Sequence, residues 1–87
     1  MKVCAYDLGY VPIGKTVEVK LGTPAIVRVM NDLNYQKYKV GADHHFMGGY
    51  IKDNVFRTTI PNSEHWYVVV DTGGYAGNIV ASAKIIE

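Results

Sequence analysis

The sequence has little cysteine and no long apolar run, and both shortages narrow what the chain can be. Cys4 is its single cysteine, so no disulfide can form within the chain, which fits a reducing compartment. The longest apolar run, Trp66 to Val70, is far shorter than the roughly 20 residues that cross a bilayer as a helix. A secretory signal is not expected, because Asp7 interrupts the first apolar residues. We therefore expect a soluble, cytoplasmic protein without a membrane span.

A large excess of one charge is also missing. Nine Lys and Arg residues oppose eight Asp and Glu residues, which gives a formal charge of +1. This balance argues against a broad surface for extended nucleic acid or anionic membrane, so any charged site has to be local. The length of 87 residues predicts one domain, 1–87, and a composition that is 48% apolar allows that domain one core.

What the sequence does contain is alternation of apolar and polar residues. Residues 16–21 place Val17, Val19 and Leu21 on one face, and residues 25–30 resume the same alternation after Gly22-Thr23-Pro24. We interpret these two strands as a hairpin. Residues 54–60 and 65–71 predict a second hairpin across the turn at Pro61, with 65–71 at the centre of its sheet because it is rich in valine and aromatic residues.

Glycine, proline and asparagine separate these short strands, and a last strand is expected over residues 78–86. The pattern predicts an all-β fold, a compact antiparallel β-sandwich or jelly-roll-like domain of seven to eight short strands. Residues 32–40 can hold at most one short helical turn, with Asn31 and Asn34 near its start.

Three stretches carry a resemblance to a known family. They are Tyr6-Asp7-Leu8-Gly9, the pair Gly48-Gly49, and His65-Trp66-Tyr67-Val68-Val69-Val70-Asp71 followed by Gly73-Gly74-Tyr75. With them the chain resembles the bacterial domain-of-unknown-function family numbered eighteen-eighty-three (DUF1883) over essentially its whole length. The resemblance implies a β-sandwich domain, found alone or joined to TIR domains, which are associated with bacterial defence and nucleotide signalling. It implies no catalytic residues.

The segment from Asn34 to Lys52 interleaves aromatic rings with cationic side chains. Rings can stack on bases or planar ligands and ammonium groups can pair with phosphates, whereas the alternative is a solvated connection whose tyrosines cap the core. The candidate binding residues are Tyr35, Lys37, Tyr38, Lys39, His44, His45, Tyr50 and Lys52, with His65, Asp71 and Tyr75 from later in the chain. Asp71 has a second interpretation, in which its carboxylate holds the following turn.

Metal binding and catalysis are the weaker hypotheses. Neighbouring His44 and His45 point to opposite faces if they lie in a strand, so we expect no metal and no cofactor. Cys4 and Ser63 are candidate nucleophiles, yet neither lies in a recognisable catalytic motif. We therefore expect a non-enzymatic recognition module that binds a protein partner or polar ligand, and the resemblance implies a link to TIR-domain systems. The alternatives are a small-molecule, nucleotide-like binder and a self-assembling structural domain, which would be a homo-oligomer.

Overall fold

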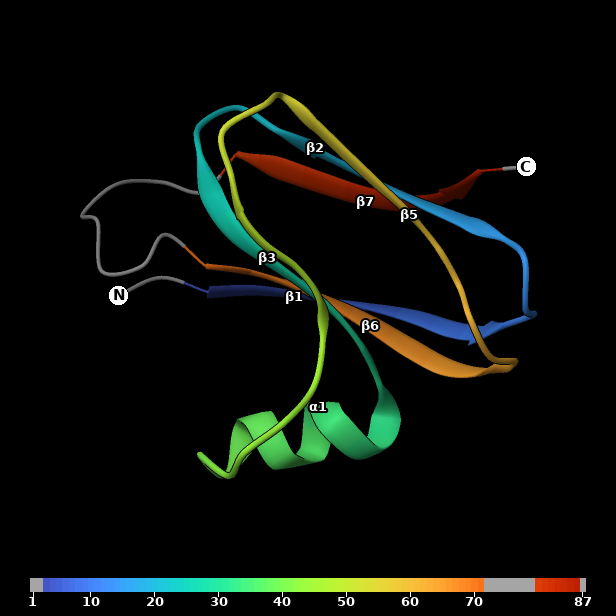
Figure 1. The fold of residues 1–87 in the computed structure, drawn as a ribbon. Helices are drawn as coiled ribbons and strands as arrows, with labels where there is room; N and C mark the ends of the chain where they lie inside the picture. The colour runs from blue at the N-terminus through green and yellow to red at the C-terminus, as the bar shows by residue number, and fades with distance from the viewer. Residues whose placement is uncertain (1–2, 72–79, 87) are drawn as a thin grey trace.

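The computed structural model describes residues 3–71 and 80–86 and shows a β-sandwich of two antiparallel sheets. The four-stranded sheet has the order β1-β6-β3-β4 and the three-stranded sheet the order β5-β2-β7. In Figure 1 the sheet of β2, β5 and β7 lies above the other, and helix α1 lies below both. The elements are β1 (Val3–Val11), β2 (Thr16–Leu21), β3 (Ala25–Asn31), α1 (Asp32–Lys39), β4 (Met47–Ile51), β5 (Val55–Thr59), β6 (Glu64–Asp71) and β7 (Ala81–Ile86). Among the described residues, no helix is long and apolar enough to cross a membrane.

The core lies between the sheets and is built by alternate residues of the inner strands. Val17 and Val19 of β2 face Val27 and Val29 of β3, and all four are fully buried with Val68 and Val70 of β6. β-branched side chains suit this position because they pack closely on a pleated surface. The expected central place of β6 is confirmed, since β6 pairs with β1 on one side and with β3 on the other.

Both predicted hairpins are wrong, although their strands exist. β2 pairs with β5 and β7, whereas β3 pairs with β4 and β6, so the chain crosses from one sheet to the other between β2 and β3. It crosses again between β5 and β6. Alternation specifies which face of a strand is buried but not which strand lies beside it, and a short turn can serve an arch between sheets as well as a hairpin.

Helix α1 begins and ends with recognisable caps and is longer than the single turn predicted. The Asn31 side chain accepts a hydrogen bond from the Asn34 amide at 3.0 Å, which caps the first turn. At the other end, Gly41 has a φ of 76°, and the amides of Gly41 and Ala42 donate to the carbonyls of Tyr38 and Lys37. This is a Schellman motif, in which a left-handed glycine ends the helix.

Strand β4 lies in the segment from Asn34 to Lys52, for which the sequence suggests a binding surface or a solvated connection and no strand. It pairs with β3 at the edge of the four-stranded sheet and contains Gly48 and Gly49, whose φ values are 120° and 143°. A Cβ atom on Gly48 would lie 2.2 Å from the Val27 carbonyl oxygen, so only glycine fits there. Because this strand lacks the apolar alternation of the others, the pattern of side chains does not reveal it.

Candidate functional site

A row of stacked rings joins α1 to the outer face of the four-stranded sheet. Tyr35 of α1 stacks on Tyr67 of β6, with ring centroids 4.0 Å apart, and Tyr67 stacks on His65 at 4.7 Å. Tyr38 continues the row one helical turn later, 6.5 Å from Tyr35. Desolvation by burial is the main cause that raises the pKa of Tyr67 above its ordinary value. These rings hold the helix, since α1 has no buried residue of its own.

The row ends at a hydrogen-bonded pair, Asp7 and His65, that depends on a β-bulge. The pairing of β1 with β6 shifts between Asp7 and Gly9, and Gly9 takes a φ of 72°. The Asp7 carboxylate accepts a hydrogen bond from the Gly9 amide at 2.8 Å and lies 2.5 Å from Nε2 of His65. The bond from Gly9, together with that from His65, lowers the pKa of Asp7 below its ordinary value. The bulge thereby turns the carboxylate toward the histidine.

Arg28 of β3 contacts both the helix and the segment that follows it. Its guanidinium carbon lies 5.4 Å from the Tyr38 ring centroid and 5.3 Å from that of Phe46, both within cation–π range. Its Nη1 also pairs with the Asp71 carboxylate at 3.3 Å. His44 contacts the same two rings and lies 3.0 Å from the Ala42 carbonyl oxygen through Nδ1. Arg28 thus connects β6, α1 and the segment after α1.

The predicted binding residues fall into three groups. Tyr35, Tyr38, His44 and His65 lie together in or beside the row of rings, and Lys39 lies over Tyr35 with its Nζ 5.0 Å from the ring centroid. Asp71 is buried and paired with Arg28. The rest are separate or outside: Lys37 is on the exposed side of α1, His45 precedes β4, Tyr50 is exposed on β4, Lys52 follows β4, and Tyr75 lies outside the described residues.

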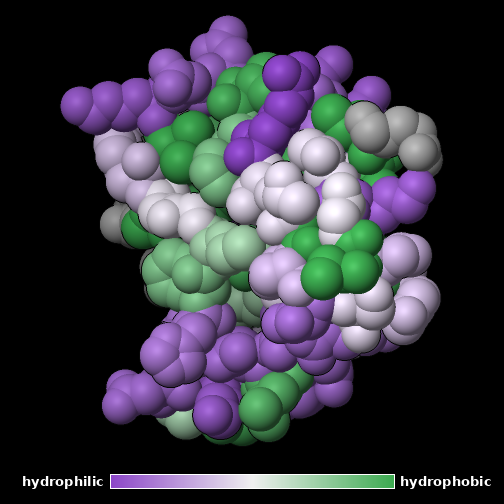
Figure 2. Space-filling view, turned by 45° about the vertical axis from the view of Figure 1, so that its right-hand side comes forward, coloured by the Kyte–Doolittle hydropathy of each residue, from purple (hydrophilic) through white to green (hydrophobic). Residues whose placement is uncertain are grey.

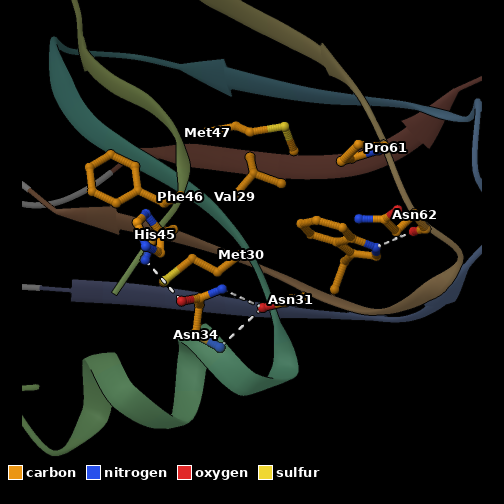
Figure 3. Close-up of a pocket in the computed structure, with 10 residues that line it drawn as sticks. Val29, Met30, Asn31, Asn34, His45, Phe46, Met47, Pro61 and Asn62 are labelled. Carbon is orange, nitrogen blue, oxygen red and sulfur yellow. Dashed lines mark hydrogen bonds between the residues drawn. The ribbon is translucent and has the colours of Figure 1, made fainter. Parts of the chain in front are cut away.

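A cavity of about 220 Å³ opens on the other side of the segment before β4. It is lined by Val29, Met30, Asn31, Asn34, His45, Phe46, Met47, Pro61, Asn62 and Trp66, of which Phe46 and Asn62 lie on opposite sides (Figure 3). In Figure 2, apolar side chains gather in the hollowed band above the largely hydrophilic lower part of the molecule. Of the predicted binding residues within 3–71 and 80–86, His45 alone lines this cavity.

Sequence reasoning did not find most of this geometry. Arg28, Tyr67 and Trp66 were assigned to strands, and Asn62 to a turn, without a role in binding. The one available signal was the capping pattern, since Asn31 and Asn34 were placed at the helix start. Asn31 caps α1, and the Asn34 side chain accepts a hydrogen bond from the His45 amide at 2.9 Å, which fixes the wall of the cavity.

The three stretches that carried the resemblance now have structural roles. Asp7 and Gly9 form the bulge, Gly48 permits close approach to β3, and β6 forms the centre of the sheet. A family model, domain of unknown function DUF1883, matches residues 1–87. The chain belongs to the DUF1883 family. For this DUF1883 domain, neither a curated protein nor a solved structure gives a significant match.

Proposed function

We propose that this DUF1883 domain is a non-enzymatic recognition module that binds a protein partner through the exposed side of α1. The observation that carries the proposal is a pair of exposed apolar side chains on a helix without buried residues. Leu33 is 62% exposed and Val40, at the helix end, is 80% exposed. Residues seven apart return to nearly the same side of a helix, so Leu33 and Val40 lie on one stripe with Lys37 between them. Such a stripe suits an apolar groove on a partner that carries an acidic group opposite Lys37.

Contacts on the inner side of α1 hold the helix, and with it the outer stripe, in a fixed position. Tyr35 and Tyr38 face the sheet, where they contact Tyr67 and Arg28. The opposite side of the helix therefore faces outward. No residue of the described chain packs against that side closely enough to bury it. A helix held in place before binding loses less conformational freedom when it binds.

The geometry gives less support to enzymatic or nucleotide-binding alternatives. His65 and Asp7 resemble a base with its orienting carboxylate, but within residues 3–71 and 80–86 no Ser, Thr or Cys side chain forms a hydrogen bond with His65. The Ser63 hydroxyl accepts instead from the Ile13 amide at 2.8 Å. The Tyr35 ring is already stacked on Tyr67, which occupies a surface that a nucleotide base would need.

A comparison of the parent protein with three aspartate variants tests the proposal. We expect Val40→Asp and Leu33→Asp to fold normally but to bind the partner more weakly, because each places a carboxylate in the apolar stripe. Val80→Asp is the matched control, since Val80 is 62% exposed and lies beside the turn that contains Gly22. The first partner to test is a TIR domain from the same source, which the family resemblance suggests, with binding measured by calorimetry. Equal binding by all four proteins would refute the role of the stripe, and light scattering would reveal self-assembly instead.

A further inference from the structure

The cavity beside the segment 45–47 has the chemistry of a ligand site that is independent of the helix stripe. It lies where β3 ends, between the start of β4 and the turn that follows β5, and is lined by residues of both segments. Val29, Met30 and Trp66 are buried and supply its apolar floor. Figure 3 shows Met47, Val29 and Met30 between Phe46 on one side and Asn62 on the other. The cavity is therefore apolar inside and has polar groups at its rim.

The polar groups of the cavity divide into those already paired and those open to a ligand. The Asn31 side chain bonds Glu64 and Asn34, and the Asn34 side chain accepts from the His45 amide, so these groups maintain the wall. By contrast, the side-chain amide of Asn62 and the imidazole of His45 form no hydrogen bond with any other part of the described chain. Each can both donate and accept, and both side chains border the cavity.

Size and charge narrow the class of ligand. Ligand pockets usually enclose about 300 to 1,000 Å³, so a cavity of about 220 Å³ holds a ring system rather than a whole nucleotide. Among the residues that the structure describes, its lining includes no Lys, Arg, Asp or Glu, and an ionised group would lose its hydration there without a charged partner. We propose that this cavity binds a neutral, ring-sized heterocycle whose edge carries both a donor and an acceptor, as a carboxamide or a free nucleobase does.

The single tryptophan of the chain provides the assay, because Trp66 lines the cavity. Its indole Nε1 donates to the Asn62 carbonyl at 2.9 Å, so occupancy next to Asn62 changes the surroundings of the fluorophore. Nicotinamide and adenine are the neutral probes, and nicotinate is the charged counterpart of nicotinamide. We expect a saturable change in Trp66 emission with a neutral probe at a dissociation constant of about 1 mM or tighter, and at least tenfold weaker binding of nicotinate.

A pair of asparagine variants separates a ligand contact from a general loss of structure. Asn62→Ala should weaken binding of the neutral probe about fivefold or more, because it removes a rim hydrogen bond at about 1 kcal/mol. Asn54→Ala is the matched control: Asn54 also lies in an exposed turn beside β5, and its backbone carbonyl likewise accepts one hydrogen bond, from Leu21 at 2.7 Å. Asn54→Ala should bind like the parent protein.

Three results would overturn the proposal. One is no saturable change in Trp66 emission, nor in its indole N–H resonance, with either neutral probe up to about 10 mM, roughly ten times the expected dissociation constant. The second is nicotinate binding as tightly as nicotinamide. The third is an equal loss of affinity in Asn62→Ala and Asn54→Ala. Each result concerns the cavity alone, so none of them bears on the proposal that Leu33 and Val40 bind a partner.

Discussion

The stack of Tyr35 on Tyr67 should control how firmly α1 is attached to the sheet. Replacing either tyrosine with Leu keeps an apolar side chain but removes the ring pair, whose centroids lie 4.0 Å apart at an interplanar angle of 16°. Pairs of this kind contribute about 0.5 to 1.5 kcal/mol beyond their buried area. Because α1 has no buried residue, this pair is one of the few contacts that attach it, beside that of Tyr38 with Arg28. A loss of about 1 kcal/mol should raise the population with α1 detached about fivefold.

A double-mutant cycle with Tyr35→Leu and Tyr67→Leu isolates the pair from the effects of each substitution. Urea unfolding of the four proteins should give a coupling energy of about 0.5 to 1.5 kcal/mol. Hydrogen exchange should accelerate at the amides of residues 34–40 in either variant, while the amides of β2 stay protected. The control is Tyr50→Leu, because Tyr50 is 61% exposed and contacts no ring among the described residues. Additive single effects, or unchanged exchange in α1, would show that the helix is held by something else.

Two further predictions concern the sheet. Gly48→Ala should destabilise the domain by about 3 kcal/mol or more, since its Cβ would lie 2.2 Å from the Val27 carbonyl oxygen. Gly49→Ala would place its Cβ near no atom of the described residues, so it should cost only its backbone strain of about 1 to 3 kcal/mol, and chemical denaturation compares the two variants. The hydrogen bond from Arg57 is the main cause that lowers the pKa of Glu18 in the folded protein. The stabilisation by this carboxylate is therefore complete above the ordinary glutamate pKa of about 4.3, and it is lost as pH falls through the lower pKa of the folded state. Glu18→Gln should therefore flatten the fall of the urea midpoint between about pH 5 and pH 2, and an unchanged slope would contradict this reasoning.

Much of the fold could be predicted because burial follows alternation along each strand. The strand 16–21 was predicted with the bounds that β2 has, and 65–71 differs from β6 by one residue. The partners of these strands could not be predicted, because β2 presents the same buried face whether it pairs with β3 or with β5. Strand β4 was missed for another reason, since Gly48 and Gly49 have no side chains from which alternation could be recognised.

The candidate sites were less predictable because they depend on contacts between distant segments. Tyr35 and His65 were chosen for their chemistry, but Tyr67, which lies between them, was treated as an ordinary strand residue. The cavity joins Asn34 of α1 to Asn62 of the turn after β5, and neither asparagine is distinctive in its local sequence. Such a site becomes visible only when the topology is known.

The crossing of the chain between sheets has a consequence for synthesis at the ribosome. β1 pairs only with β6 among the described strands, and Val3 lies opposite Asp71. The first strand therefore has no partner until nearly the whole chain has been made, and neither layer can be completed from one half of the sequence. We expect nascent chains that end before β6 to stay sensitive to protease, and the finished domain to form in one late and comparatively slow step.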